Sequence, residues 1–433
     1  MKILTKISAV VLTLIILLGV VILPANASYE LSRNLDKSSF KNDYPYIFVH
    51  GMGGWGTEDP YYSESPYWGG DLMPGSENDM IKILNDQGVK AYAPSVGPLS
   101  SAWDRACELY AQLTGTVVDY GEAHSKAHNH DRYGISYEGQ AIMGKPWNLK
   151  DKLNLVGHSF GGATVRLFTS LMTFGSQEEL DATGKNTSEL FRGDHKSIHA
   201  CITLSAPHNG SQVSNYLVDT KLPLFGIALA GHILGCTKGD SFGVFSLKFG
   251  HFGLTPKQGE KVAKFNPFAV WNFYKTNDNC GYDMTLAGAS ELNKTIKLSP
   301  YTYYYSYSTA ASEPTGIFGR QKPIDSVNSI FKTSSTMIAL TEGLTIDGVK
   351  IEGNWVVNDG IVPLASALYP DSDAATATDY EDTIAKGEKI KKGRWYYTDT
   401  MVGMDHFDFC GTKDYPTSFE DFYFSMVETA NSR

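Results

Sequence analysis

The sequence predicts an α/β fold in which a mostly parallel central sheet is flanked by helices. The main observation is a repeated order along the chain: a short β-rich run, a turn of small residues, then a helical pattern. The runs are Tyr44–His50, Leu153–Gly157 and Ile198–Leu204, and they precede Gly51, Ser159 and Ser205. Strands that alternate with helices form parallel sheets covered on both faces. A second observation is that the chain has no repeat, no coiled-coil heptad and no long low-complexity linker.

The remaining elements follow from the same patterns. Further strands are expected at Thr302–Ser308, Gly353–Val357 and Trp395–Thr398. The spacing of apolar residues predicts helices over Ala163–Thr173 and Phe419–Thr429. In such a fold the loops at the strand ends carry the chemistry.

Composition excludes two classes of protein. The 433 residues have a formal charge of −10, and 42% of them are hydrophobic and 19% charged. Intrinsic disorder requires low hydrophobicity and high net charge, so the chain is globular. Proteins that bind nucleic acid neutralise phosphates with clustered Lys and Arg, so the acidic balance argues against a nucleic-acid partner.

The first residues have the composition of a secretory signal peptide. Two lysines precede an uncharged apolar stretch from Ile7 to Leu23, and small residues continue to Ala27. The alternative is a retained membrane anchor, because the apolar stretch is close to the length that spans a bilayer. Cleavage after Ala27 predicts a secreted mature chain of residues 28–433, without stable membrane insertion.

The cysteines do not form the dense framework of a disulfide-stapled protein. They are widely spaced and five in number: Cys107, Cys201, Cys236, Cys280 and Cys410. An odd number leaves at least one free thiol, and the sequence does not identify a pair for a single bridge.

The sharpest motif is G-x-S-x-G at residues 157–161, between an apolar strand and a helical segment. This arrangement holds a serine on a tight strand-to-helix turn, where its hydroxyl is exposed. Small neighbours at Gly157 and Gly161 relieve the crowding of the strained backbone. Ser159 is therefore the predicted nucleophile.

A serine nucleophile needs a histidine base and a carboxylate, which follow it in that fold in the order Ser, acid, His. Among the histidines after Ser159, only His406 lies near the end of the chain with room for an acid before it. Asp359 lies at a turn directly after an apolar run, whereas Asp347 and Asp373 lie in polar stretches. An Asp-Gly pair alone is more simply a turn, but the serine motif favours Asp359 as the acid.

Acyl transfer also requires N–H donors for the oxyanion. One is expected from the residue after the nucleophile, Phe160. The other is expected in the H-G-x-G-G loop that follows the first strand, where the N–H of Met52 is the candidate. His50 precedes the serine and is therefore interpreted as a structural residue.

These and other segments together resemble the zinc-containing thermoalkaliphilic lipases secreted by Gram-positive bacteria. The similar segments are Tyr44–Gly56, Tyr67–Gly70, Val96–Glu108, Val118–Gly121, Gly175–Glu179, Ala206–Gly210, Asn358–Val362 and Asp405–His406. They are distributed over essentially the whole mature chain. The resemblance implies a single α/β-hydrolase domain over residues 28–433, triacylglycerol hydrolysis, and the triad Ser159, Asp359 and His406.

The resemblance also implies metal sites. A structural zinc would be held by two aspartates and two histidines in an insertion at about 98–135 plus 265–282: Asp104, His124, His130 and Asp278. Spacing alone would pair His124 with His128 at i, i+4, or leave a histidine-rich loop without metal. A structural calcium is implied near the catalytic histidine, with Asp408 and Asp414 as carboxylate ligands.

Two features depart from or extend the family pattern. The residue after the nucleophile is Phe160, where the family usually has glutamine. An apolar stretch, Leu222–Cys236, lies within the implied lid at about 215–245. As a lid it would cover the acyl pocket in water and move onto a lipid surface; the alternative is an ordinary core helix.

The sequence therefore predicts a secreted lipase that acts on lipid or ester substrates at an oil–water interface, with no obligate protein partner. A carboxylesterase or phospholipase with the same triad is the nearest alternative. A catalytically silent hydrolase-fold binding protein is the alternative from another class.

Overall fold

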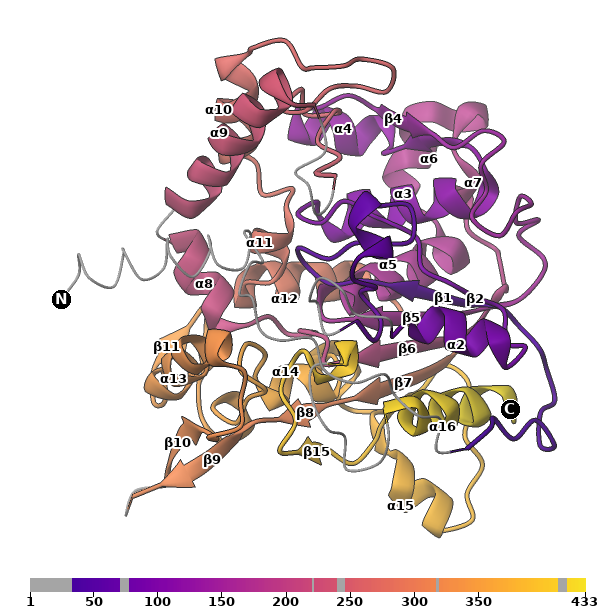
Figure 1. Cartoon of the computed structure of the whole chain (residues 1–433), viewed down its shortest axis with the longest axis vertical. Coiled ribbons are helices and arrows are strands. Elements are labelled where there is room, and N and C mark those ends of the chain that lie inside the picture. The colour runs from indigo at the N-terminus through magenta and orange to yellow at the C-terminus, as the bar shows by residue number, and fades with distance from the viewer. Residues whose placement is uncertain (1–32, 71–77, 220–221, 240–245, 317–318, 412–418) are drawn as a thin grey trace.

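A parallel sheet forms the centre of the molecule (Figure 1). The computed structural model describes residues 33–70, 78–219, 222–239, 246–316, 319–411 and 419–433. Seven strands lie in the order β13-β14-β7-β6-β5-β1-β2, and every neighbouring pair is parallel. Their bounds are β1 Tyr46–Val49, β2 Ala91–Tyr92, β5 Leu153–His158, β6 Ile198–Leu204, β7 Tyr303–Tyr307, β13 Thr378–Asp379 and β14 Trp395–Tyr397. The predicted α/β fold with a parallel sheet is confirmed.

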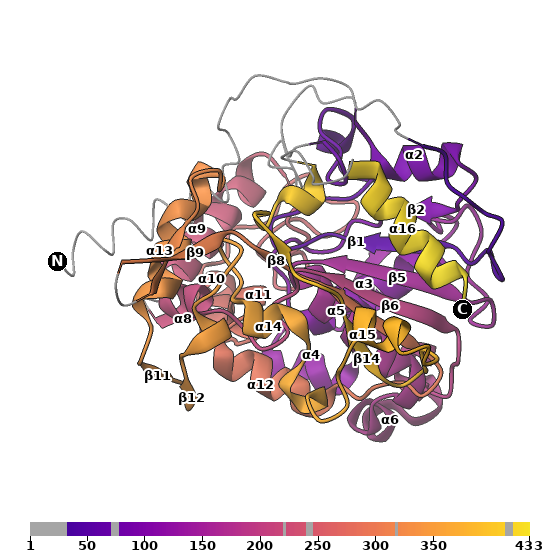
Figure 2. The same ribbon diagram turned by 90° about the horizontal axis from the view of Figure 1, so that it is seen from below.

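Helices cover both faces of this sheet, as Figure 2 shows from below. On one face lie α2 (Met80–Asp86) and α16 (Phe419–Asn431), and on the other lie α3 (Ala102–Thr114) and α5 (Phe160–Phe174). The strands β5 and β6 are buried along their whole length, which explains their nearly continuous apolar sequences. The predicted strands 44–50, 153–157, 198–204, 302–308 and 395–398 and the predicted helices 163–173 and 419–429 all have counterparts in the structure.

Smaller elements surround the sheet. The antiparallel pair of β3 (Val117–Asp119) and β4 (Tyr133–Ser136) lies with α4 (Glu122–His128) at one end of the molecule. The other helices are α6 Gln177–Thr183, α7 Glu189–Arg192, α8 Gln212–Asp219, α9 Leu222–Thr237, α10 Pro267–Lys275, α11 Cys280–Asp283, α12 Leu286–Thr295, α13 Lys332–Leu340, α14 Leu364–Leu368 and α15 Tyr380–Ala385. The other strands are β8 Thr309–Ala310, β9 Ser312–Thr315, β10 Arg320–Pro323, β11 Thr345–Ile346, β12 Val349–Lys350 and β15 Met401–Val402.

One predicted strand is wrong. Residues 353–357 begin with a 3₁₀ helix, Gly353–Trp355, instead of a strand. The N–H of Trp355 donates to Glu352 O and that of Val356 to Gly353 O, so these amides find their partners locally. The apolar side chain of Val356 packs with Leu286 in a small cluster apart from the main core, and that packing explains the apolar pattern.

Two further predictions concern the ends and the thiols of the chain. The predicted signal peptide, residues 1–27, lies outside the described residues. Within the part of the chain that the structure describes, no helix has both the length and the apolar character needed to cross a membrane.

All five cysteines are free thiols, so none of them forms the single bridge that the sequence left open.

Candidate active site and metal centre

Ser159 lies in a sharp turn between β5 and α5. Its backbone has φ 54° and ψ −130°, in the left-handed half of conformational space that side chains other than glycine rarely adopt. A Cβ on Gly161 would overlap the carbonyl oxygen of Val49, and one on Gly157 would overlap the carbonyl of Gly161. Only glycine therefore fits beside this turn, as the motif predicts, and the strained turn holds the serine at the sheet edge.

His406 and Asp359 form a buried hydrogen-bonded pair. The Nδ1 of His406 lies 2.8 Å from Asp359 Oδ2, and the backbone N–H of His406 donates to the Asp359 carbonyl at 2.9 Å. The other carboxylate oxygen of Asp359 accepts the N–H groups of Ile361 and Val362 at 3.1 and 2.8 Å. Both carboxylate oxygens of Asp359 are therefore engaged, and the imidazole is held in one orientation.

Two of the three predicted triad residues line one pocket. Ser159 and His406 both line a cavity of about 70 Å³, while Asp359 lies behind His406. The remaining lining is mostly apolar and includes Met52, Leu217, Met284, Phe331, Ile361 and Val362. Such a lining accepts an apolar group next to a reactive hydroxyl.

The loop that contains Met52 is fixed by its neighbours. The N–H of Gly51 donates to Tyr67 Oη at 2.9 Å, and that of Gly53 donates to Pro98 O at 2.9 Å. Met52 itself lines the pocket, and among the described residues none accepts its N–H. Phe160 is the first residue of α5, so its N–H has no acceptor within the helix. These are the two donors expected from the sequence.

Arg105 stabilises the same loop through its buried side chain. Its buried guanidinium donates to the carbonyl oxygens of His50 and Gly97. The Nε of Arg105 donates to Thr164 Oγ1 at 2.9 Å, and its Cζ lies 5.2 Å from the centre of the Phe160 ring. Phe160, which stands in place of the glutamine usual in the resembling family, thus packs against a cation.

His50 bonds to the backbone of this loop through both ring nitrogens, which agrees with the structural role predicted for it. Its Nδ1 lies 2.9 Å from Gly51 O and its Nε2 accepts the Val96 N–H at 3.2 Å. Burial holds the pKa of His50 well below its usual value. A neutral, fully bonded imidazole is not available as a base.

A chain of hydrogen bonds joins this loop to the backbone of His406. Burial lowers the pKa of His158 well below its usual value, so its ring is neutral. Its Nε2 lies 2.9 Å from His406 O, which only accepts, so Nε2 carries the hydrogen. Nδ1 of His158 therefore accepts from the Tyr67 hydroxyl at 2.7 Å, and that hydroxyl accepts from Gly51. The direction of every hydrogen bond in the chain is thereby fixed.

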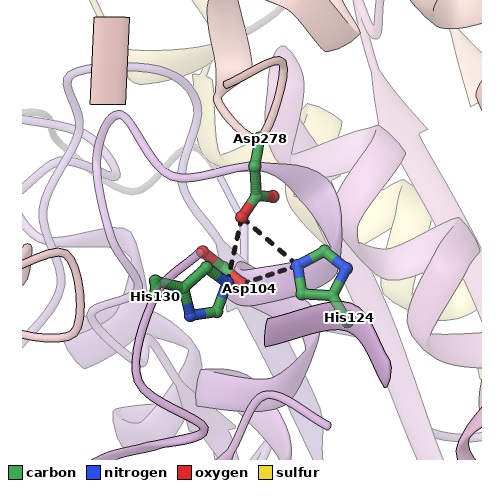
Figure 3. Close-up of side chains that lie close together, drawn as sticks. All are labelled: Asp104, His124, His130 and Asp278. Atoms are coloured by element: carbon green, nitrogen blue, oxygen red, sulfur yellow. Dashed lines mark ion pairs between the residues drawn. The ribbon is translucent and has the colours of Figure 1, made fainter. Parts of the chain in front are cut away.

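Four side chains converge beside the start of α3, as Figure 3 shows. Asp104, His124, His130 and Asp278 each offer one ligand atom, and these atoms all lie within 4.8 Å of one another. His124 Nε2 lies 3.3 Å from Asp104 Oδ1 and 3.2 Å from Asp278 Oδ2, and His130 Nε2 lies 3.2 Å from the same Asp278 oxygen. The four atoms are buried and none has a hydrogen-bond partner. This group can hold a metal ion.

Three of the six separations between the ligand atoms match those around a tetrahedral ion. Bonds of about 2.0–2.1 Å to such an ion place neighbouring ligand atoms about 3.3 Å apart, close to the 3.2–3.3 Å observed. Burial opposes a charge on His124, but the carboxylates of Asp278 and Asp104 outweigh it and raise its pKa to about 10. The two carboxylates therefore attract a positive charge to this point.

The surrounding backbone explains which histidines converge. The carboxylate of Glu179 accepts the N–H groups of Ala123 and His124 at 3.1 and 2.8 Å, which fixes the start of α4. After α4 the chain reverses at Asn129, whose φ is 58°, and so brings His130 beneath His124. His128 points elsewhere and its Nδ1 bonds to Thr276 Oγ1 at 3.0 Å. The structure thus favours the pair from the resemblance over the i, i+4 pair.

The calcium site remains a prediction. Asp408 is buried, and its Oδ2 accepts the Asp405 N–H at 2.6 Å. Asp414, the other predicted ligand, lies outside the described residues.

Sequence reasoning missed several residues of the site. Tyr67 and Arg105 lay within segments that carried the resemblance, and His158 lay within the motif itself, but no spacing rule gave them a role. His251, which is buried with its Nε2 3.0 Å from Asp104 Oδ2, had no signal at all, because 147 residues separate the two.

Comparison with known sequences connects this geometry to a family. The model of the family described as "Lipase-like, C-terminal domain" matches residues 42–429. Lipase 1 of Staphylococcus aureus is 33% identical over 420 residues, which cover 94% of this chain and 57% of that protein. Lipase 2 of the same species is 31% identical over 398 residues, covering 90% of this chain and 53% of that protein. The chain thus spans little more than half the length of these curated relatives.

Solved structures match this chain over nearly the full length of both chains. The crystal structure of Staphylococcus hyicus lipase has a TM-score of 0.74 at 27% identity and covers 92% of this chain and 97% of its own. EstA from Clostridium botulinum has a TM-score of 0.72 at 29% identity, with 96% and 93% covered. Lipase 1 from Pelosinus fermentans has a TM-score of 0.69 at 29% identity, with 90% and 99% covered.

Proposed function

Because the chain belongs to the lipase-like C-terminal domain family, we propose that it is a secreted lipase that hydrolyses triacylglycerol esters at an oil–water interface. That membership confirms the resemblance to the lipases of Gram-positive bacteria and the α/β-hydrolase fold. The observation that carries the proposed activity is the strained Ser159 in one pocket with His406, which is held by Asp359 at 2.8 Å.

The proposed reaction proceeds through an acyl-enzyme. His406 accepts the proton of the Ser159 hydroxyl as its oxygen adds to the ester carbonyl, and then returns the proton to the leaving alcohol. Water, activated by the same imidazole, cleaves the acyl-enzyme and releases the fatty acid. The carboxylate of Asp359 holds Nδ1–H and stabilises the charged imidazole.

The tetrahedral intermediate carries a negative oxygen that the N–H groups of Met52 and Phe160 are placed to stabilise. The Phe160 N–H lies at the start of α5, where the helix dipole also favours negative charge. Arg105 and Tyr67 hold the Met52 loop in position from opposite sides. These contacts support the proposal that the Met52 donor is held in position before substrate binds.

We propose zinc as the ion held by Asp104, His124, His130 and Asp278. Zinc accepts histidine nitrogens and carboxylate oxygens, and four protein ligands leave no open position, which favours a structural over a catalytic site. Bound zinc would neutralise the two buried carboxylates and connect α3, α4 and the segment before α11. The set lies apart from the pocket, so none of the catalytic steps involves it. A structural calcium at Asp408, with Asp414, remains part of the proposal.

The predicted lid at about 215–245 includes α8 and α9. Leu217 of α8 lines the pocket beside the nucleophile. Among the described side chains of α9, none does. The proposed lid therefore covers the pocket through α8, with the apolar α9 as its continuation.

The test compares emulsified long-chain triacylglycerol with a soluble short-chain ester, for the mature chain and its Ser159→Ala variant. We expect a rate that rises once the substrate exceeds its solubility limit, and a loss of at least about a thousandfold in the variant.

Other outcomes would select the alternatives. Activity confined to soluble esters would indicate a carboxylesterase, and preferential hydrolysis of phospholipid would indicate a phospholipase. Activity that persists in the Ser159→Ala variant would reject this nucleophile. The absence of any ester hydrolysis would favour a binding protein.

A further inference from the structure

Large apolar side chains gather on the surface of α9, α10 and the segment before α10. Six of the 14 large hydrophobic side chains that the described residues expose lie between 229 and 271: Leu229, Ile233, Val262, Phe265, Phe268 and Trp271. Phe265 and Phe268 are 68% and 73% exposed. An exposed cluster of this kind marks an interaction site more often than scattered apolar residues do. We call these six residues the apolar face.

The helical periodicity explains why they share a surface. On α10, Phe268 and Trp271 are three positions apart and exposed, whereas Ala269, Val270 and Phe273 are buried beneath them. The start of α10 is fixed to α9, because the N–H of Asn266 donates to His232 Nε2 at 2.7 Å.

The segment before α10 runs along α9. The Ala263 N–H donates to Gly235 O at 2.9 Å, and the Phe265 ring stacks on His232 with centroids 5.4 Å apart. Ile233 follows His232 and is exposed. The two helices and this segment therefore present one continuous surface.

The charge around the apolar face is opposite to that of the chain. Residues 229–275 contain six lysines and two acidic residues in a chain whose net charge is −10. Lys248 is buried and donates to Ser95 O, and Lys257 pairs with Asp131, so four lysines remain for the face. The exposed lysines that border the face are Lys238, Lys261, Lys264 and Lys275. Lys275 Nζ lies 4.7 Å from the Trp271 ring centre. Aromatic rings edged by lysines are typical of a surface that rests on an anionic lipid interface.

The face lies beside the pocket that contains Ser159. Helix α8, which lines the pocket through Leu217, contacts α9 on one side and α13 on the other. Figures 1 and 2 both show α8, α9, α10 and α13 on the same edge of the molecule. Leu340 at the end of α13 is also exposed. A lipid surface in contact with the apolar face would therefore lie next to α8 and the pocket that α8 lines.

We propose that the apolar face and its lysines dock the protein on an oil–water interface that carries free fatty acid anions. The inference rests on the proposed function, because that reaction releases these anions at the same surface. The rings would insert among acyl chains while the lysine ammonium groups pair with carboxylates. The released fatty acid would therefore strengthen docking. The lysines would make the apolar face prefer an interface that carries carboxylates over a neutral one, which burial of apolar side chains alone does not do.

The test separates docking from hydrolysis. The Ser159→Ala protein is floated with triolein droplets coated with phosphatidylcholine, with or without oleate in the coat. We expect oleate to increase the bound fraction several-fold. Adding Phe268→Ser and Trp271→Ser should lower binding about tenfold or more on both droplets. Adding Lys261→Gln and Lys264→Gln should remove only the increase due to oleate.

Matched controls lie elsewhere on the surface. Val402 is 75% exposed on β15, and Lys185 is exposed after α6, so Val402→Ser and Lys185→Gln should leave binding unchanged. In chains that keep Ser159, all these variants should hydrolyse a soluble ester at the parent rate, because none of the substituted residues lines the pocket.

Several results would overturn the proposal. Droplet binding that survives the aromatic substitutions would exclude the apolar face. An oleate effect that survives the lysine substitutions would exclude the charge contribution. Binding to phosphatidylglycerol vesicles but not to oleate-coated droplets would make the partner a membrane, and a dimer that the lysine substitutions dissolve would make it a second copy. Failure of the proposed function is distinguishable, because it would appear as no hydrolysis of emulsified triacylglycerol by the parent chain, whereas docking is measured separately with the Ser159→Ala protein.

Discussion

At the scale of single residues, the site depends on buried side chains that never touch the reacting bond. Tyr67 and His158 connect the Gly51 N–H to the carbonyl of His406 through three hydrogen bonds. Since the pKa of His158 is depressed by burial, its ring keeps one donor and one acceptor nitrogen at neutral pH. The Met52 loop and the imidazole that we propose as the base are thus positioned relative to each other by polar groups with fixed roles.

Removal of the Tyr67 hydroxyl tests this connection. Tyr67→Phe removes the acceptor of the Gly51 N–H and leaves His158 Nδ1 only the Cys410 thiol, 3.7 Å away. We therefore expect kcat for a soluble ester to fall about ten- to a hundredfold with KM nearly unchanged. Stability should fall by only ~1–2 kcal/mol. Steady-state kinetics and thermal unfolding measure the two effects.

The control for this change is Tyr62→Phe, which removes a hydroxyl bonded to Asp79 at 2.9 Å and away from the pocket. It should cost similar stability without a change in kcat. Equal effects of the two variants on kcat would contradict a positioning role for Tyr67.

At the scale of elements, α3 connects the metal group to the oxyanion loop. Consecutive residues of this helix reach different neighbours: Asp104 lies next to His124, and Arg105 donates to His50 and Gly97. The helix start is itself anchored, since Ser101 Oγ accepts the Asp104 N–H and Asp283 accepts the Ala102 N–H at 2.7 Å. A change at the metal group would therefore be transmitted through a rigid helix.

Loss of the metal should destabilise this region. Asp278→Asn removes a carboxylate charge from the group, and we expect the variant to be purified without the proposed zinc and to lose ~3–5 kcal/mol of unfolding free energy. Metal analysis and thermal unfolding check this, and dipicolinate treatment of the parent chain should give the same shift in Tm.

His128→Gln is the matched control, because His128 lies beside the group and bonds to Thr276 instead. It should retain zinc and stability. Loss of zinc in this variant would mean that His128, not His130, completes the ligand set.

At the scale of the whole molecule, α16 closes one face of the sheet and its end is bonded to β6. His199 on β6 is buried, and its Nε2 lies 3.2 Å from Ala430 O near the end of α16. Burial lowers the pKa of His199 to about 4. The folded state therefore favours a neutral ring, whereas the unfolded chain binds a proton below about pH 6.5.

This difference between the pKa of His199 in the folded and the unfolded chain predicts that the free energy of unfolding falls at acid pH. The contribution of His199 is fully present above pH 6.5 and is lost as the pH falls towards 4, which removes ~2–3 kcal/mol. In His199→Phe the unfolding free energy should be lower at neutral pH, because the Ala430 bond is lost, but should change less between pH 6.5 and 4. Urea unfolding at several pH values measures the slope.

Tyr303→Phe provides the comparison, since this ring packs on His199 at 5.3 Å and the titrating group stays. Its slope should equal that of the parent chain. An unchanged slope in His199→Phe would assign the acid sensitivity to other groups.

The sequence by itself determined what is encoded locally. Strand, turn and helix follow one another in the 153–174 region, and the glycines beside Ser159 are needed because neighbouring backbone fills the space of a Cβ. Periodicity records which face of an element is buried, so most of the strands and helices were predictable. The error at 353–357 has the same origin, since its apolar residues are buried by a turn rather than a strand.

The tertiary structure alone decided which distant groups meet. The bond between His158 and His406 spans 248 residues, and that between His251 and Asp104 spans 147. The choice of His130 over His128 depended on a backbone reversal at Asn129 that helical spacing does not contain. The physical reason is that a sequence pattern reports the burial of an element, whereas a hydrogen-bond partner is selected by how the elements pack.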